Sequence, residues 1–188
     1  MLKSKNVKII AVVGMAGAGK GESCAFFAKK GIPILRLGDQ TDIGLKKLGM
    51  AINPQNERWY REKLRKDLGM AAYAMKILPR IQQEIKNKKN LIVLDGLYSW
   101  EEYLVLKKKY PSLILLCVYA KPKIRYRRLQ EREIRKFTPK QSKERDIAEL
   151  INLNKGGPIA MADYLVKNEG SLKMLEAKLK KIFQLINE

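Results

Sequence analysis

Short, nearly continuous apolar runs alternate with longer amphipathic stretches along this chain of 188 residues. Most of these runs are apolar almost throughout, as is typical of strands that are buried on both faces of a sheet. The pattern predicts strands at 7–13, 32–37, 90–95, 112–119 and 162–167, and helices at 20–30, 41–50, 57–88, 100–109, 122–135, 138–152 and 171–187. Strands that alternate with helices indicate a parallel sheet with crossover helices. We therefore expect one α/β domain over 1–188, in which a five-stranded parallel sheet is flanked by helices in three layers.

The composition favours a globular protein without a membrane span. Hydrophobic residues make up 46% and charged residues 31% of the chain, and no apolar run approaches the roughly 20 residues that cross a bilayer. The chain contains no histidine, which removes the commonest general base. Cys24 and Cys117 lie far apart in apolar contexts, so neither a disulfide framework nor a zinc site is expected. We expect a cytoplasmic protein with no membrane partner.

The net charge of +20 leaves two interpretations open. Such a field attracts anions, including nucleotides, nucleic acids and acidic membrane surfaces. However, lysine runs at 86–89 and 107–109 fall at expected helix ends, where they are solvated. The surplus is therefore either functional or mainly compositional.

A glycine-rich segment, GMAGAGK, begins directly after the first predicted strand and leads into a helix. This context favours a phosphate-binding loop, because backbone N–H groups and the helix N-terminus turn toward phosphate oxygens there. Lys20 is expected to reach the β- and γ-phosphates of ATP. The alternative is a tight turn with a solvated lysine. The residues expected to contact the nucleotide in this segment are Gly14, Ala16, Gly17, Ala18, Gly19, Lys20, Gly21, Glu22 and Ser23.

The usual Ser or Thr after the loop lysine is Gly21 in this chain. Glu22 or Ser23 could serve a magnesium ion in its place, and the sequence does not choose between them. Glu22 could also simply favour the first helical turn. Asp95, at the end of a buried strand, is the second expected metal anchor or, alternatively, a turn cap. Asp39 follows another strand at the same sheet edge, where ligands bind, unless it caps the helix over 41–50.

A basic segment at 121–145 contains eleven Lys or Arg residues and three Glu residues. Arg128 and Arg132 stand four residues apart and therefore share one helix face. Arginine suits phosphate binding because it stays charged and donates two parallel hydrogen bonds. The alternative is a solvated basic helix.

These features, in this order, resemble the P-loop nucleoside monophosphate kinases. Adenylate kinase also carries glycine after the loop lysine, and an Asp-Gly pair follows a strand as at Asp95. An Arg-Leu-x-x-Arg lid element and an Ala-Asp…Asn-x-Gly tail are similar to dephospho-coenzyme A kinase. The nearest likeness is to a group of archaeal-type nucleotide-kinase-like proteins related to both. One departure is that the arginine expected two or three residues after Asp-Gly is absent, since Leu97, Tyr98 and Ser99 stand there.

The resemblance implies a role for each remaining candidate. A helical insertion at 40–88 would bind the acceptor, and a short lid at 122–150 would close over ATP. Asn168 and Gly170 would border the base of ATP, and Arg65 would bind the acceptor phosphate with Arg58 and Arg61 behind it. The catalytic set would be Lys20, Asp39, Arg128 and Arg132, and the acceptor-binding set would be Asp39, Arg58, Arg65, Asp95, Arg132 and Arg145.

Two functions follow from these residues. The first is an ATP- and Mg²⁺-dependent phosphotransferase that moves the γ-phosphate to a nucleotide or nucleotide-like acceptor. The second is an ATP-binding or ATP-hydrolysing regulatory module that acts on nucleic acid. The net charge and the missing arginine support the second function.

Overall fold

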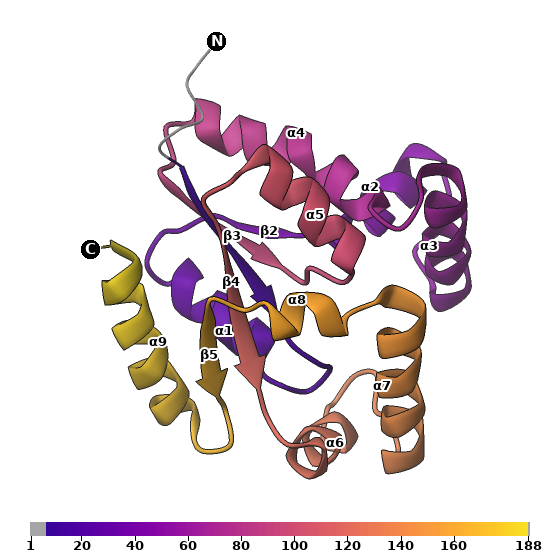
Figure 1. Cartoon of the computed structure of the whole chain (residues 1–188). Helices are drawn as coiled ribbons and strands as arrows, with labels where there is room; N and C mark the ends of the chain where they lie inside the picture. The colour runs from indigo at the N-terminus through magenta and orange to yellow at the C-terminus, as the bar shows by residue number, and fades with distance from the viewer. Residues whose placement is uncertain (1–6, 188) are drawn as a thin grey trace.

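The computed structural model describes residues 7–187 and shows a single parallel sheet within them (Figure 1). Its strands are β1 (Lys8–Val13), β2 (Ile34–Arg36), β3 (Leu91–Asp95), β4 (Leu113–Tyr119) and β5 (Tyr164–Lys167). They lie in the order β2-β3-β1-β4-β5, and each neighbouring pair is parallel. The predicted five-stranded parallel α/β fold is confirmed.

The two faces of the sheet bury alternate residues of each strand. In β1, Ile9, Ala11 and Val13 enter one core, whereas Ile10 and Val12 enter the other. Because successive side chains of a strand point to opposite faces, a strand that is covered on both sides must be apolar throughout. This requirement explains the continuous apolar runs in the sequence.

Helices cover both faces and complete three layers. One face packs against α1 (Lys20–Ala28) and α9 (Leu172–Asn187), which bury Phe27, Leu175 and Leu179. The other face packs against α4 (Ala72–Lys86) and α5 (Trp100–Lys109), which bury Ile77 and Leu106. In Figure 1, α1 and α9 lie at the lower left of the sheet, and α4 and α5 lie above it.

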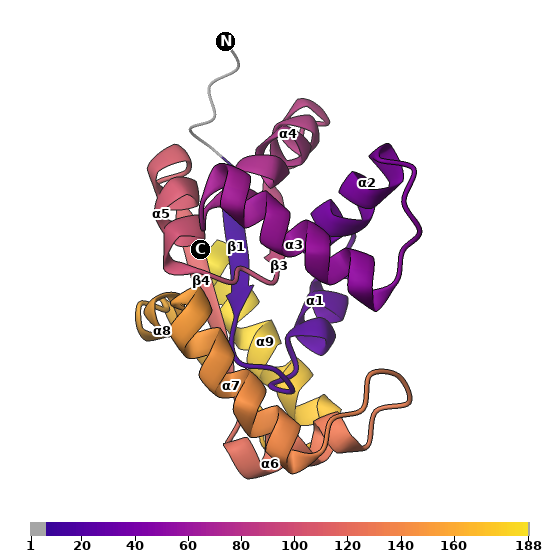
Figure 2. The ribbon, with the colours of Figure 1, turned by 90° about the vertical axis from the view of Figure 1, so that its right-hand side faces the viewer.

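The remaining helices flank the region that follows β1. They are α2 (Asp39–Lys47), α3 (Pro54–Leu68), α6 (Pro122–Gln130), α7 (Pro139–Leu153) and α8 (Gly156–Ala160). Figure 2 shows α2 and α3 in the upper part of this side, and α6 and α7 in the lower part, around the end of the β1–α1 loop. A long loop over 131–138 joins α6 to α7.

The main differences between the predicted and the observed helices are as follows. The stretch at 57–88 forms two helices, α3 and α4, because the backbone turns at Gly69, where φ is +75°. The helix predicted at 41–50 already begins at Asp39, and that predicted at 122–135 ends at Gln130. The short α8 was not predicted, because GGPIA offers neither a helical period nor good helix formers.

Candidate nucleotide-binding site

The loop between β1 and α1 is packed so closely that glycine is required at two of its positions. Gly14 has a φ of +138°, and a Cβ there would lie 2.3 Å from the carbonyl oxygen of Val118. Gly19 has a φ of +104°, and a Cβ there would lie 2.2 Å from Nδ2 of Asn168. Such conformations and contacts exclude larger residues. The glycine spacing in the sequence therefore reflects the backbone path of the loop.

Lys20 begins α1 and folds its side chain back over the loop. Its Nζ donates hydrogen bonds to the carbonyl oxygens of Gly14 and Met15, at 2.9 and 3.1 Å. Burial, together with the nearby positive charge of Lys155, lowers the pKa of Lys20 to about 7. A partly buried ammonium that lies among other cations in this way is suited to receive an anion.

A cleft of about 620 Å³ opens beside this loop. It brings together many of the predicted site residues from four separate parts of the chain. Its lining residues are Gly17, Gly19, Lys20, Gly21, Glu22, Arg36, Asp95, Tyr98, Arg128, Arg132, Asn168, Gly170, Leu172 and Leu175. The loop, the strand end at Asp95, the arginines Arg128 and Arg132 and the Asn-Glu-Gly tail thus meet in one place.

The cleft residues carry two carboxylates that fit a magnesium ion. Asp95 and Glu22 both line the cleft, whereas the hydroxyl of Ser23 is buried and donates to the carbonyl oxygen of Gly19 at 3.1 Å. Among residues 7–187, no group of three or more metal-ligating side chains of the His, Cys, Asp and Glu types is found. Mg²⁺ commonly takes only one or two carboxylates together with substrate phosphates, so this donor set fits.

Burial raises the pKa of two further side chains near Asp95. The thiol of Cys24 is buried beside Asp95, and burial and this carboxylate raise its pKa. Burial and the charge of Asp95 also raise the pKa of Tyr98 to about 12. Both groups therefore stay protonated at neutral pH, and the Tyr98 hydroxyl can donate a hydrogen bond into the cleft.

Eight predicted site residues lie outside the set that lines the cleft: Gly14, Ala16, Ala18 and Ser23 of the loop segment, and Asp39, Arg58, Arg65 and Arg145 from elsewhere in the chain. Asp39 is the first residue of α2, and its carboxylate accepts a hydrogen bond from Arg80 at 3.2 Å. Arg58 is exposed and pairs with Glu62, and the guanidinium of Arg65 lies 5.3 Å from the ring centre of Tyr73. Arg145 pairs with Glu149 of α7 at 2.9 Å.

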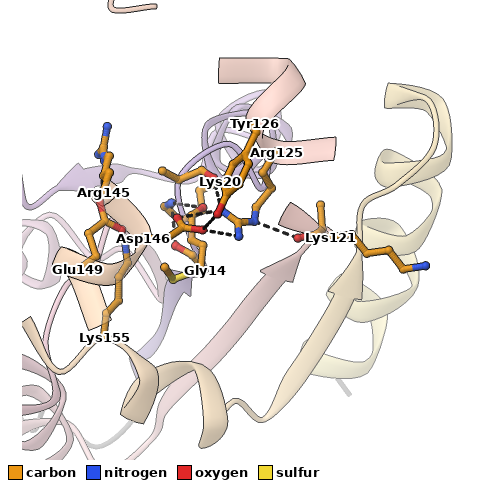
Figure 3. Close-up of polar contacts among 12 residues, drawn as sticks. Gly14, Lys20, Lys121, Arg125, Tyr126, Arg145, Asp146, Glu149 and Lys155 are labelled. Atoms are coloured by element: carbon orange, nitrogen blue, oxygen red, sulfur yellow. Dashed lines mark hydrogen bonds and ion pairs between the residues drawn. The ribbon is translucent and has the colours of Figure 1, made fainter. Parts of the chain in front are cut away.

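Sequence reasoning missed a buried clamp that fixes the loop. Arg125 of α6 is 4% exposed and donates to the carbonyl oxygen of Ala16 at 3.0 Å. Its guanidinium also binds both carboxylate oxygens of Asp146 in α7, at 3.0 and 2.6 Å (Figure 3). The clamp therefore joins the loop, α6 and α7. Arg125 lies within the basic segment at 121–145, and the spacing of the arginines there does not distinguish a buried side chain from solvated ones.

A second missed cluster lies behind the loop. Lys155 is 2% exposed, and its ammonium binds the carboxylate of Glu149 at 2.5 Å, on which Arg145 also converges (Figure 3). Burial opposes ionisation of Glu149, but Lys155 and Arg145 hold its pKa below the usual value. The cluster keeps one positive charge in excess. A lysine in a loop between helices carries no sequence signal of burial.

Asn168 has a structural role that its sequence context did not reveal. Its side-chain amide donates to the carbonyl oxygen of Ala18 at 2.8 Å, and its backbone carbonyl oxygen accepts from Arg128 at 3.0 Å. The residue after β5 therefore holds both the glycine loop and Arg128.

Comparison with known proteins identifies the family. A model of the family described as an AAA domain matches residues 10–152. The UPF0200 protein of Pyrococcus horikoshii is 31% identical over 183 residues, which cover 95% of this chain and 97% of that protein. The chain belongs to the UPF0200 family. A second UPF0200 protein, from Methanocaldococcus jannaschii, is 32% identical and aligns over 95% of this chain and 90% of its own length.

The solved structures agree on the fold of this UPF0200 chain. Shikimate kinase from Bacteroides thetaiotaomicron superposes with a TM-score of 0.60 at 14% identity, covering 96% of this chain and 99% of that protein. The fold is therefore that of the P-loop kinases, and the predicted resemblance is confirmed at that level. Within residues 7–187, the search for a helix able to span a membrane finds none.

Proposed function

We propose that this protein is an ATP-dependent phosphotransferase that moves the γ-phosphate to a nucleotide or nucleotide-like acceptor. The observation that carries the proposal is the charge of the cleft. Lys20, Arg36, Arg128 and Arg132 line it, against the two carboxylates Glu22 and Asp95. Positive charge in excess in a partly desolvated cleft favours a bound polyanion.

The residues divide the work of phosphoryl transfer among them. Loop amides and Lys20 would hold the β- and γ-phosphates, while Arg128 and Arg132 would balance charge on the moving group. Mg²⁺, when bound by Asp95 and Glu22 with the phosphates, would supply further neutralisation. Asp39 would orient the acceptor from the start of α2.

Two segments of the chain would form the parts of the site that close over the ligands. Residues 40–88 would contribute the acceptor side through α2 and α3, while α4 within this range packs on the sheet. Residues 122–150 would form the lid. The ion pair at 3.0 Å between Arg135 of the 131–138 loop and Glu57 of α3 supports this arrangement, because it joins the two parts.

Incubation with γ-labelled ATP and Mg²⁺ tests the proposal. Nucleoside monophosphates and dephospho-coenzyme A serve as acceptors, and labelled product is separated and counted. We expect Lys20→Met to abolish transfer while the fold survives, and Lys29→Met, which replaces an exposed lysine paired with Glu176, to leave it unchanged. Full activity of the Lys20 variant, or no labelled product from any acceptor, would contradict the proposal.

A second function remains as the alternative because of the net charge of +20. An ATP-hydrolysing regulatory module would bind RNA or DNA with a steep dependence on salt. Its ATPase activity would not respond to small acceptors. Measuring both properties on the same preparation separates the two functions.

A further inference from the structure

Strand pairing supplies an arginine at the place where the segment after Asp95 lacks one. Leu97, Tyr98 and Ser99 follow Asp95-Gly96, and none of them carries a positive charge. However, β2 pairs with β3 in a register that sets Arg36 opposite Asp95. Both residues end their strands at the carboxyl edge of the sheet and line the cleft. A guanidinium thus reaches the same edge from the neighbouring strand.

The Arg36 guanidinium lies between two carboxylates without binding either closely. Its Nη1 is 4.0 Å from Asp39, and its Nε is 4.0 Å from Asp95. Both distances exceed hydrogen-bond length. The side chain is 56% exposed. Within residues 7–187, the guanidinium donates no hydrogen bond to the protein, so its donors are available to a ligand.

Arg80 differs from Arg36 in that its guanidinium is already engaged. It donates to the carboxylate of Asp39 at 3.2 Å and to the carbonyl oxygen of Arg36 at 3.4 Å. Arg80 therefore lies closer to the Asp39 carboxylate than Arg36 does. With Asp95 directed to the metal in the proposed function, Arg36 is left without a dedicated counter-charge.

We propose that Arg36 binds the anionic group of the acceptor, a phosphate monoester. The inference rests on the proposed function and adds to it the residue that selects the acceptor class. Arginine presents two parallel N–H donors that match phosphate oxygens, which a lysine does not. The acceptor phosphate would lie on the β2 side of the cleft, across from the lid arginines Arg128 and Arg132.

Equilibrium binding tests the inference without requiring turnover. Nucleoside monophosphates and the matching nucleosides are titrated by calorimetry into protein that is saturated with a non-hydrolysable ATP analogue and Mg²⁺. We expect Arg36→Met to weaken monophosphate binding about 10- to 100-fold, as loss of a charged hydrogen-bond pair would. Arg36→Lys should recover only part of the affinity. Binding of the ATP analogue should change less than twofold.

The matched control is Lys29→Met, which removes the same charge from an exposed residue that follows α1 and pairs with Glu176. It should leave monophosphate affinity unchanged. The inference is overturned if no monophosphate binds, if Arg36→Met binds it as tightly as the unmodified protein, or if the nucleosides bind equally well. In those cases, transfer of label to another acceptor would still support the proposed function. Absence of transfer to any acceptor would contradict the proposed function, whatever the binding results.

Discussion

Lys20 shows how one residue links burial to ligand binding. Its ammonium lies in a partly buried site near Lys155 and Arg145, and burial is the largest of the effects that lower its pKa to about 7. A bound phosphate would favour the charged form and raise that pKa again. Nucleotide binding should therefore be coupled to protonation of this side chain.

We expect ATP binding at pH 8 to take up close to one proton. The free protein has mostly lost the Lys20 proton there, whereas the complex retains it. Affinity should consequently fall as the pH rises through 7. Calorimetric titrations in two buffers that differ in ionisation enthalpy measure the uptake. Equal heats in both buffers, or affinity that does not change between pH 6 and 8.5, would contradict the expectation.

At the residue scale, the sequence identified the loop and the cationic lining of the cleft but not the residues that hold them. Glycine spacing and Lys20 are local features, and a motif captures them. Arg36 takes its role from a neighbour that is distant along the chain, because it meets Asp95 only through strand register. Lys155 lies six residues after Glu149, and the chain brings the two together by turning at Asn154, where φ is +50°.

At the element scale, α6 and α7 act on the loop through the clamp of Arg125 and Asp146. The pair is buried, and the guanidinium binds both carboxylate oxygens, so we expect it to contribute more to the geometry of the loop than to net stability. The carbonyl of Ala16 is fixed by the same guanidinium. Loss of the clamp should therefore affect nucleotide binding separately from folding.

Asp146→Asn should destabilise the protein by about 3–5 kcal/mol, because Arg125 is then left as a buried charge without its counter-ion. The double variant Arg125→Met/Asp146→Leu should regain most of that stability. It should still bind ATP more weakly, since Ala16 has lost its donor. Urea unfolding and nucleotide titration measure the two effects. Recovery of both properties in the double variant would show that the clamp serves folding alone.

The ion pair of Arg135 and Glu57 joins the 131–138 loop to α3. Glu57 is largely buried and also accepts from Arg61 at 3.3 Å, so it is held in place on α3. Glu57→Gln should therefore free the loop. We expect release of a fluorescent ATP analogue to accelerate about two- to fivefold, the effect of one partly exposed ion pair.

Stopped-flow displacement measures this release rate. Glu62→Gln is the matched control, because Glu62 pairs with an exposed arginine on the same helix and does not reach the loop. An equal acceleration in both variants would point to the charge of α3 in general and away from the specific contact.

Helices whose ends carry clear local signals were predicted most closely. The helix at 100–109 matches α5 at both ends, since a capping box of Ser99 and Glu102 fixes its start. The stretch at 57–88 was wrongly taken as one helix, because Gly69 within an otherwise helical composition does not by itself signal a break. Pro79, by contrast, lies inside α4 without ending it.

At the scale of the whole molecule, the sheet is held between two separate cores. Leu179 of α9 is fully buried in the core that α1 shares. Leu179→Ala should cost about 2–5 kcal/mol of unfolding free energy through lost contacts and a cavity. Leu185→Ala on the same helix, where the side chain is 54% exposed, should change it little. Denaturant titration followed by circular dichroism compares them, and equal losses would contradict this packing.

The architecture could be predicted because the five apolar runs alternate with helices, which leaves few possible topologies. Strand order and register could not be predicted, because they depend on contacts between segments that lie far apart in sequence. The cleft follows from both. It is assembled where β1, β3 and the residue after β5 come to the same edge of the sheet.

The carbonyl oxygens that Lys20 and Arg128 contact would compete with an anion that binds in the cleft. Gly14 and Met15 accept from Lys20, and Asn168 accepts from Arg128. These backbone oxygens occupy hydrogen-bond donors that a phosphate would use. A bound anion must therefore replace existing hydrogen bonds of Lys20 and Arg128 with new ones. Weakly basic, singly charged anions gain little from such an exchange. A polyphosphate that replaces several partners at once would gain much more, and we therefore expect the site to discriminate against small, singly charged anions.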